Sequence, residues 1–340
     1  MNVASLCHGT RSSVVFQIMI LLLGGSGYIG QAFHTELHRR SLEFLSLSRA
    51  DVDYTRFGDM VAVLKRTKPS FVINSAGYTG KPNVDACELH RADTLMGNVL
   101  FPQTIAQACE ATGVPWGHVS SGCIYAGAKI VDKGVTRTEA DLMKPDVAAL
   151  VARDPSCVQG FVETDQPNFS FRRPPCSFYS ASKALAEEVL AGFEGLFVWR
   201  LRIPFDEFDG PRNYLSKIQR YSKVYENINS ISHRGEFARA CLSLWEKRAP
   251  FGVYNMTNPG WTTTRKVVDH ARDILGLRRE FEFWADDEEF YRLAAKTPRS
   301  NCVLDGTKLL ATGVMMRPVE EALEDALRQW KPQSSQTSNL

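Results

Sequence analysis

The chain has 340 residues, of which 44% are hydrophobic and 23% are charged, and its formal net charge at pH 7 is +2. These values are typical of a soluble globular protein and carry no signature of nucleic-acid or membrane binding. The eight cysteines form no Cys-x-x-Cys pair and the seven histidines show no metal-ligand spacing, so we expect reduced thiols, no metal site and a cytoplasmic location.

A buried strand followed by spaced glycines is expected near the N-terminus. The apolar segment Met19–Leu23 leads directly into Gly24, Gly27 and Gly30. The first two glycines let the backbone turn and approach the phosphates of a dinucleotide, and the third lets the next helix pack closely. The phosphates then lie at a helix N-terminus, where free N–H groups favour an anion. The residues that we expect to bind a cofactor here are Gly24, Gly27, Tyr28, Ile29 and Gly30.

The end of the second expected strand bears on which dinucleotide binds. An apolar segment at 42–47 follows the glycines at the distance of one βαβ unit. Sites that prefer NAD usually place Asp or Glu near the end of this strand, but Ser48 and Arg49 stand here. The planar guanidinium of Arg49 suits a 2′-phosphate, which favours NADP(H) as the cofactor. Asp51 lies close by, so NAD(H) stays an alternative.

Further strands are expected along the first two thirds of the chain, at 71–77, 116–121 and 197–203. Helix-compatible segments separate them, and this alternation indicates an α/β protein with a doubly wound parallel sheet. The domains that we predict are an N-terminal extension over 1–18, a dinucleotide-binding domain over 19–204 with an insertion at about 128–161, a mainly substrate-binding region over 205–330 and a disordered tail over 331–340.

Tyr179 and Lys183 form the first candidate catalytic pair. They stand four residues apart, so on a helix they share one face. An ammonium group near a phenol favours the phenolate, and we expect Lys183 to lower the pKa of Tyr179. Such a pair also arises by chance on amphipathic helices, so it gains weight only from the glycines and from Ser120–Tyr125 upstream.

These segments together resemble the active site of the extended short-chain dehydrogenase/reductase superfamily, which has a Rossmann fold with a smaller C-terminal substrate-binding domain. The resemblance implies that Ser121 hydrogen-bonds the substrate oxygen, that Tyr179 exchanges a proton with it, and that Lys183 holds the nicotinamide ribose. The further residues that it places along the cofactor are Ala76, Gly77 and Asn98.

From about Met19 to Leu310, the chain is more closely similar to the dTDP-4-dehydrorhamnose reductase branch, and within it to bifunctional nucleotide-rhamnose synthase/epimerase-reductases. The segments that carry this likeness are Tyr78–Glu88, Ser121–Tyr125, Pro211–Ile218, Tyr254–Gly260 and Pro298–Asn301. The substrate-binding residues that it implies are Thr79, Asn83, Ser121, Gly122, Cys123, Asn213, Lys217, Arg299 and Asn301.

Cys123 and Lys217 are the residues that bear on whether the resemblance implies epimerisation as well as reduction. In the bifunctional group, a cysteine two places after the catalytic Ser/Thr and a lysine on the substrate helix are the acid and base of a 3,5-epimerisation. Side chains two apart on a strand face the same side, so we expect Cys123 to point with Ser121 toward the sugar. We also expect desolvation to lower the pKa of Lys217. Without the resemblance, Cys123 would be interpreted as a packed small residue and Lys217 as a solvated one.

We therefore predict NADPH-dependent reduction of a nucleotide-linked 4-keto-6-deoxyhexose of the dTDP- or UDP-4-dehydrorhamnose type, with 3,5-epimerisation. The resemblance also implies a homodimer, paired through the helices of 98–112 and 179–193. The long insertion at 128–161 and the acidic segment Phe205–Asp209 depart from the family pattern, so the nucleotide and the exact sugar stay open.

Three alternatives remain: a reductase that acts only at C4, an NAD-dependent nucleotide-sugar 4-epimerase or 4,6-dehydratase, and a non-catalytic regulatory subunit. Dehydratases of the superfamily usually carry acidic residues after the catalytic Ser/Thr, where Gly122 and Cys123 stand here. The presence of Ser121, Tyr179 and Lys183 argues against a subunit that has lost its chemistry.

Overall fold

A six-stranded parallel sheet forms the centre of the computed structural model, which describes residues 19–332. The strand order is β13-β8-β4-β3-β1-β2, and every neighbouring pair is parallel, as expected of a doubly wound α/β sheet. Its strands are β1 (Met19–Leu23), β2 (Glu43–Leu47), β3 (Phe71–Asn74), β4 (Trp116–Ser121), β8 (Leu196–Leu201) and β13 (Gly252–Asn255). The expected extension, 1–18, and all but the first two residues of the expected tail lie outside the described residues.

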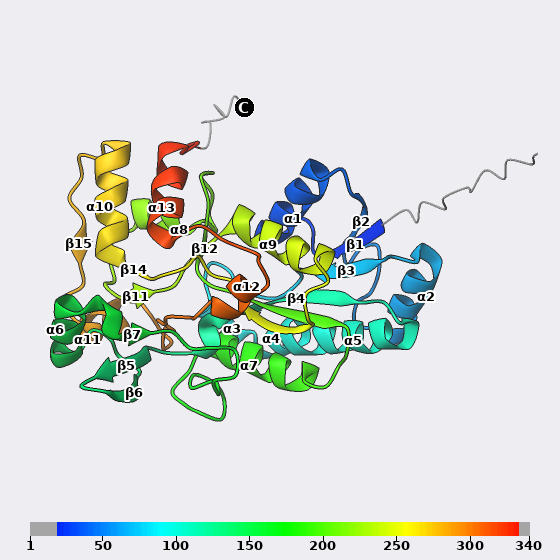
Figure 1. Cartoon of the computed structure of the whole chain (residues 1–340), viewed down its shortest axis with the longest axis horizontal. Helices are drawn as coiled ribbons and strands as arrows, with labels where there is room; N and C mark the ends of the chain where they lie inside the picture. The colour runs from blue at the N-terminus through cyan, green and yellow to red at the C-terminus, as the bar shows by residue number, and fades with distance from the viewer. Residues whose placement is uncertain (1–18, 333–340) are drawn as a thin grey trace, which may run out of the picture.

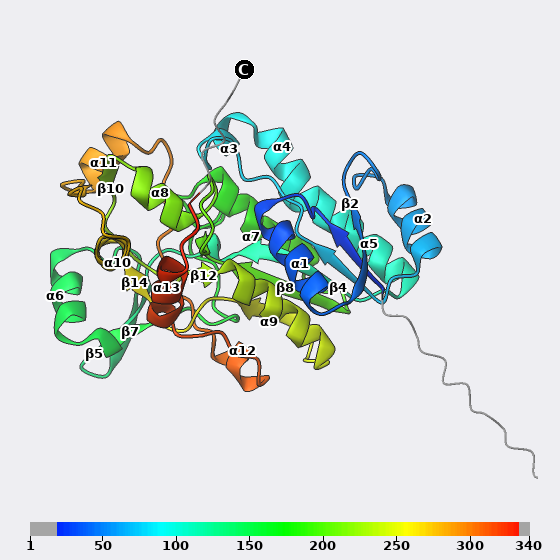
Figure 2. The same cartoon turned by 90° about the horizontal axis from the view of Figure 1, so that it is seen from above.

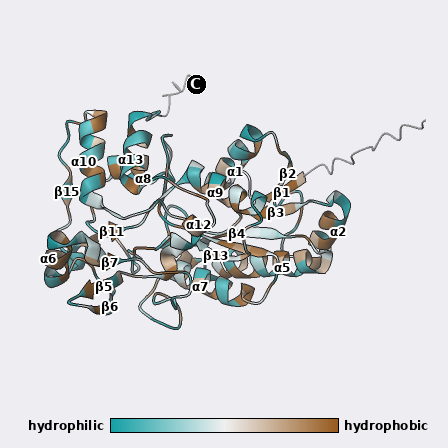
Figure 3. Cartoon of the chain, in the orientation of Figure 1, coloured by the Kyte–Doolittle hydropathy of each residue, from teal (hydrophilic) through white to brown (hydrophobic). Residues whose placement is uncertain are grey.

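Helices cover both faces of the sheet, because alternate residues of each strand enter opposite cores. Ile20 and Leu22 pack into the core beneath α1 and α9, whereas Leu21 and Leu23 pack into the core beneath α2 and α5. In Figure 1, α1 and α9 lie above the strands and α5 and α7 below them, and Figure 3 shows hydrophobic strands between helices of mixed polarity. These helices are α1 (Tyr28–Arg39), α2 (Phe57–Thr67), α5 (Phe101–Thr112), α7 (Phe178–Leu190) and α9 (Arg234–Glu246).

The last strand of the sheet comes from beyond Pro204, where we expected the first domain to end. β13 pairs in parallel with β8, and α9, which precedes it, packs against α1. The strand at 252–255 is only four residues long and half-buried. Its pattern of apolar residues is therefore too short to distinguish a strand from a loop. The chain therefore leaves the sheet after β8, returns to it through α9 and β13, and then leaves it again.

The remaining C-terminal elements form a smaller unit beside the sheet, around a core that α10 and α13 share with Phe205 and Leu215 (Figure 2). Three two-stranded pairings, β9 with β12, β10 with β15 and β11 with β14, hold its connections. The elements are β9 (Pro204–Phe205), α8 (Tyr214–Arg220), β10 (Lys223–Val224), β11 (Ile228–Asn229), β12 (Ser232–His233), β14 (Thr262–Thr263), α10 (Thr264–Leu275), β15 (Glu282–Phe283), α11 (Asp287–Leu293) and α13 (Val319–Arg328). The short helix α12 (Thr307–Ala311) packs against β13 instead, with Leu309 in the core beneath α1 and α9.

The expected insertion at 128–161 is a small folded unit of its own. It contains a three-stranded sheet, ordered β6-β5-β7, and the helix α6, which overlaps the helix-like segment of the sequence. Ile130 and Val147 pack against Ile228 and Val303 of the C-terminal unit, so the hydrophobic core of the insertion is shared with that unit. Its elements are β5 (Ala128–Asp132), β6 (Val135–Glu139), α6 (Pro145–Arg153) and β7 (Val158–Gln159).

A π-helical turn joins two helices behind the loop that follows β3. α3 (Ala86–Leu89) leads into α4 (Arg91–Leu95), which continues through the π turn Met96–Leu100 into α5. Single π turns inside helices often occur at functional sites, and this one contains Asn98. Within residues 19–332, no helix is both long and apolar enough to cross a bilayer.

Gly30 offers a test of the close approach between α1 and the glycine loop. A Cβ atom built on Gly30 would lie 2.1 Å from the carbonyl oxygen of Gly24. We therefore expect Gly30→Ala to lower the free energy of unfolding by about 1–3 kcal/mol, although alanine is the better helix former. The matched control is Gly58→Ala in α2, where a Cβ meets nothing within 4 Å and a gain of about 0.5–1 kcal/mol is expected. Equal effects of the two substitutions in urea unfolding would contradict this packing.

Candidate active site

The loop between β1 and α1 has the shape that a dinucleotide pyrophosphate needs. Gly24 adopts φ +77°, and a Cβ there would lie 2.6 Å from the backbone nitrogen of Ala76. Gly27 begins α1 and supplies no side chain to cap it, so the first N–H groups of the helix are free for an anion. The glycine loop and the Ala76 loop after β3 thus form a cradle that side chains would fill, and these residues fit the expected cofactor.

Arg49 and Asp51, which both follow β2, differ in whether their side chains have partners. Both the backbone N–H and the hydroxyl of Ser48 donate to Asp51 Oδ2, at 2.8 and 2.7 Å, and these bonds lower the pKa of Asp51. Arg49 is exposed and has no hydrogen bond or ion pair within residues 19–332. The carboxylate that left NAD(H) open is therefore engaged locally, whereas the guanidinium is available.

Tyr28 makes contacts that the sequence did not predict. Its hydroxyl donates to Asp206 Oδ1 at 3.1 Å, and the guanidinium of Arg234 lies 4.2 Å from the centre of its ring. Arg234 also pairs with Asp206 and donates to the backbone oxygen of Tyr28 at 2.9 Å. The side chain of Tyr28 therefore joins the glycine loop to the acidic segment after β8, and a direct contact with the cofactor stays a prediction for its backbone alone.

The residues that we expect to catalyse the reduction converge at the carboxyl end of β4. Ser121 ends this strand, and Tyr179 and Lys183 lie one turn apart on α7. Burial raises the pKa of Tyr179, the neighbouring Cys123 thiol acts in the same direction, and the Ser121 hydroxyl opposes both. The expectation that Lys183 would lower this pKa is therefore wrong for the free protein, because burial dominates. A phenol with a raised pKa keeps its proton near neutral pH, which suits a proton donor.

Lys183 is held where the loop after β3 approaches α7. Burial lowers its pKa to about 8, and its Nζ donates to the carbonyl oxygen of Val119 at 3.3 Å. A Cβ on Gly77 would lie 3.6 Å from that nitrogen and 3.2 Å from Oδ1 of Asn98. Asn98 itself bonds both backbone groups of Tyr78, at 2.8 and 2.9 Å. The structure thus brings Gly77 and Asn98 to Lys183, with Asn98 bracing the loop.

Cys123 lies near Ser121 for a different reason from the one expected. β4 ends at Ser121, and Gly122–Ile124 form one turn of 3-10 helix, so the strand argument for the direction of Cys123 is wrong. The Ser121 hydroxyl caps this turn by accepting from the backbone N–H of Cys123 at 3.2 Å. Burial raises the pKa of the Cys123 thiol, while hydrogen bonds with Ser121 and Ser180 lower it. The thiol is therefore buried among polar groups and not in the hydrophobic core.

Lys217 lies on α8, the helix that the resemblance assigns to the substrate. It is half-buried, burial lowers its pKa as expected, and nearby Arg212 acts in the same direction. Within the described part of the chain, the side chain of Lys217 has no hydrogen bond or ion pair, and none joins it to Ser121, Cys123 or Tyr179. Arg212 donates to the hydroxyl of Thr79 at 3.0 Å, which ties α8 to the loop after β3.

The other expected substrate residues are engaged within the protein. Arg299 makes a two-pronged ion pair with Asp85, at 2.6 and 2.9 Å, and Asn301 accepts from Asn229 at 3.1 Å. Asn83 accepts from the backbone N–H of Asp85 at 2.8 Å. A Cβ on Gly122 would lie 2.4 Å from Leu304, so the absence of a side chain at this position leaves room for Leu304. These contacts position the walls of the site, and direct contacts of the same residues with a substrate stay a prediction.

Asn213 is the clearest departure from the expected substrate contacts. It is fully buried, and its Nδ2 donates to Oδ1 and the backbone oxygen of Asp206, both at 2.8 Å. Its Oδ1 accepts from the backbone N–H of Leu215 and so caps α8. The side chain of Asn213 therefore links α8 to Asp206 and the glycine loop, and a direct contact with a substrate stays a prediction.

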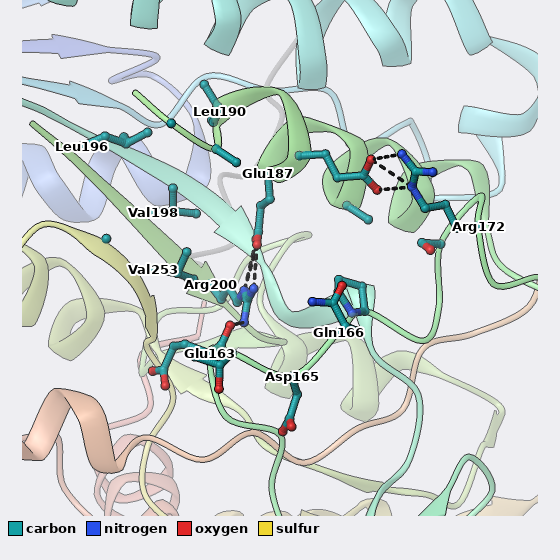
Figure 4. A pocket seen from close by; sticks show the side chains of 18 of the residues that line it. Glu163, Asp165, Gln166, Arg172, Glu187, Leu190, Leu196, Val198, Arg200 and Val253 are labelled. Atoms are coloured by element: carbon teal, nitrogen blue, oxygen red, sulfur yellow. Dashed lines mark hydrogen bonds and ion pairs between the residues drawn. The ribbon is translucent and has the colours of Figure 1, made fainter. Parts of the chain in front are cut away.

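A buried ion pair that the sequence analysis missed fixes α7 against the sheet. Glu187, one turn after Lys183, pairs with Arg200 of β8 at 2.7 Å and accepts from the Ser120 hydroxyl at 2.6 Å. Figure 4 shows this pair in a cavity of about 680 Å³ along another face of α7, which none of the expected catalytic residues lines. Arg200 in a hydrophobic strand and Glu187 two turns after Tyr179 were the available signals, because a charge inside a buried strand needs a partner.

The chain is similar to known proteins along most of its length. The family model described as RmlD substrate binding domain matches residues 18–331. A bifunctional dTDP-4-dehydrorhamnose 3,5-epimerase/dTDP-4-dehydrorhamnose reductase of Arabidopsis thaliana is 33% identical over 265 residues, 78% of each protein. A trifunctional UDP-glucose 4,6-dehydratase/UDP-4-keto-6-deoxy-D-glucose 3,5-epimerase/UDP-4-keto-L-rhamnose-reductase of the same plant is 28% identical over 93% of this chain. The chain spans only 42% of that longer relative.

Solved structures share the fold. The L780 UDP-rhamnose synthase of Acanthamoeba polyphaga mimivirus superposes with a TM-score of 0.77 and 20% identity, covering 92% of this chain and 99% of that one. The dTDP-4-dehydrorhamnose reductase of Bacillus anthracis, solved in complex with NADP, gives a TM-score of 0.71 at 17% identity, with 92% and 98% covered. At these identities the likeness establishes the architecture.

The buried pair between Glu187 and Arg200 generates a test. Glu187→Gln leaves the Arg200 charge without a carboxylate, and we expect the free energy of unfolding to fall by about 3–5 kcal/mol. The matched control is Glu188→Gln, which breaks an exposed pair with Arg172 and should change stability by less than about 1 kcal/mol. Urea unfolding measures both, and a loss below about 1 kcal/mol for Glu187→Gln would show that the pair does not hold α7 in place.

Proposed function

The chain belongs to the RmlD substrate binding domain family, and from this premise we propose that it epimerises a nucleotide-linked 4-keto-6-deoxyhexose at C3 and C5 and then reduces it at C4 with NADPH. The substrate class is that of dTDP- or UDP-4-dehydrorhamnose, and the product serves rhamnose biosynthesis. The observation that carries the proposal is that the Cys123 thiol interacts with Ser121 and with the Tyr179 and Lys183 pair of an NAD(P)-dependent oxidoreductase.

The proposed epimerisation uses groups on two sides of the sugar. The ketone at C4 acidifies the hydrogens at C3 and C5, and removal of either proton leaves an enolate on O4. Ser121 and Tyr179 hydrogen-bond that oxygen as its charge develops. Lys217, whose pKa burial lowers, removes the proton as a neutral amine, and Cys123, whose pKa burial raises, returns one to the opposite face. One centre is thereby inverted. Proton exchange with solvent then restores the neutral amine and the thiol, and the same step inverts the second centre.

The proposed reduction uses the other groups at the same ketone. NADPH, when bound, supplies the hydride for C4. Gly24 and Gly27 would hold its pyrophosphate at the start of α1, and Lys183 its nicotinamide ribose. Tyr179 donates its proton to O4, and because burial raises its pKa, the phenol is protonated at the start of the step. Reduction then fixes the inverted centres, because the ketone that acidified them is gone.

We also infer a preference for NADP(H) over NAD(H), a cytoplasmic location and a homodimer. Free Arg49 and engaged Asp51 support the cofactor preference, and the seven described cysteines, all of them free thiols, fit a reducing compartment. Exposed apolar side chains beside α5, those of Leu89 and Leu100, fit a paired helical face. A monomeric mass in sedimentation equilibrium would contradict the dimer.

The cofactor preference predicts a selective loss. In Arg49→Ala, we expect KM for NADPH to rise roughly tenfold or more, because a charge-assisted bond to the 2′-phosphate is lost. KM for NADH, which lacks that phosphate, should change less than about twofold. Steady-state kinetics with both cofactors measures this, and a parallel rise for NADH would mean that Arg49 acts on the shape of the loop alone.

The two proposed reactions can be separated by substitution. With a 4-keto-6-deoxyglucose nucleotide in heavy water, Cys123→Ala should lower deuterium exchange at C3 or C5 by about a hundredfold or more. It should still reduce a pre-epimerised substrate, whereas Tyr179→Phe should lose reduction. NMR follows exchange and NADPH absorbance follows reduction.

Cys302→Ala, a buried neighbouring thiol, is the matched control and should keep both activities. Unchanged exchange in Cys123→Ala would remove Cys123 as the acid and leave a reductase that acts only at C4. Turnover without stoichiometric NADPH consumption would instead indicate a 4-epimerase, and full turnover of Tyr179→Phe would reject the assignment.

A further inference from the structure

Arg202 is a buried cation without a carboxylate. It follows β8 directly and is 6% exposed. Its Nη2 donates to Oδ1 of Asn229 at 2.5 Å and to the backbone oxygen of Ser300, and the guanidinium also interacts with the Cys302 thiol. Its Nε is buried without a partner, and within residues 19–332 no acidic side chain pairs with it. Arg200, two positions earlier, is equally buried but has Glu187.

The side chain of Arg202 runs alongside the turn that carries Cys123. A Cβ built on Gly122 would lie 3.6 Å from Cδ of Arg202. Asn229, its main partner, also accepts from the backbone N–H of Cys302, whose thiol in turn donates to the carbonyl oxygen of Gly122. The guanidinium thus lies in one small network with the turn that carries Cys123, and its charge favours the thiolate form of both Cys123 and Cys302.

A buried charge without a counter-ion is costly, so its retention points to an anion that forms nearby during function. In the proposed epimerisation, one anion forms beside Arg202 at each turnover. When Cys123 gives its proton to carbon, the S–H bond breaks, a C–H bond forms, and the electron pair stays on sulfur as a thiolate.

We propose that Arg202 is a positioning residue that acts through Cys123 by stabilising the thiolate left after proton donation. The inference rests on the proposed epimerase function. It explains why, within residues 19–332, the guanidinium bonds uncharged groups alone, those of Asn229, Ser300 and Cys302. A carboxylate there would cancel the charge that the thiolate needs. Burial keeps Cys123 protonated before the step. The positive charge of Arg202 then lowers the free energy of the thiolate that forms when the proton leaves.

Other groups also face the Cys123 thiol, from each element packed around it. Lys183 and Arg202 favour its charged form, and the hydroxyls of Ser121 and Ser180 do so by hydrogen bonding. The groups that interact with it unfavourably when charged are Tyr179 of α7, Cys87 of α3 and Cys302 of the C-terminal unit. Lys183 is committed to the carbonyl oxygen of Val119 and to the expected ribose, so Arg202 is the cation left for the thiolate.

The test titrates Cys123 directly, without substrate. In a Cys302→Ala background, the rate of iodoacetamide alkylation of Cys123 is measured against pH by peptide mass spectrometry. Asn229→Asp leaves Arg202 in place but gives it a carboxylate at the position of the Oδ1 atom that it already contacts. We expect the midpoint of alkylation to rise by about one pH unit or more, and the melting temperature to rise because the buried charge is now paired. Arg202→Gln should give the same change in midpoint, and Arg202→Lys should restore most of it.

The same variants link the thiol to the reaction. Exchange at C3 or C5 should fall at least about tenfold more than reduction of a pre-epimerised substrate, with its pH profile displaced to match the midpoint. A midpoint within about 0.3 pH unit of the parent in folded Asn229→Asp overturns the inference, as does a fall in the melting temperature of that variant. A raised KM for the nucleotide sugar with an unchanged midpoint would assign Arg202 to substrate binding instead. Failure of the proposed function appears separately, as unchanged exchange in Cys123→Ala.

Discussion

The active site depends on one buried contact between a helix and two strands. Glu187 of α7 accepts from Ser120 of β4 and pairs with Arg200 of β8, and all three are largely removed from solvent. Because Ser120 precedes Ser121, and Glu187 follows Lys183 by one turn, the contact sets the distance between the strand and the helix that carry the proposed catalytic residues. A charged pair is directional as well as strong, so it specifies the rotation of α7 in a way that apolar packing alone does not.

Much of the fold was predictable because parallel strands buried on both faces appear in the sequence as apolar runs. The strands at Met19–Leu23 and Trp116–Ser121 follow this rule, whereas β13, half-buried at the edge of the sheet, does not. The site was predictable in part for another reason: Gly24, Tyr179 and Lys183 have local spacings with a direct physical meaning. Cys123 shows the limit, because the strand ends at Ser121 and a capped turn, not strand periodicity, directs the thiol.

What the sequence could not indicate are contacts between residues far apart along the chain. Asp206 stands in a segment whose acidity was unexplained, and the structure shows it joining Tyr28 of the glycine loop to Asn213 at the start of α8. The helix that carries Lys217 is thereby tied to the cofactor loop. In the same way, nothing in the order of residues distinguishes Arg200, which is paired, from Arg202, which is not. The two arginines differ only in what folding brings beside them.

The central claim is that one site both exchanges the protons beside a sugar ketone and reduces that ketone. The most direct measurement is the mass and configuration of the product that the unaltered protein forms from UDP- or dTDP-4-keto-6-deoxyglucose with unlabelled NADPH in heavy water. The account predicts a rhamnose nucleotide with deuterium at both C3 and C5 and one NADPH consumed per product. A reduced sugar without deuterium at either carbon, or no reduced sugar at all, would contradict it.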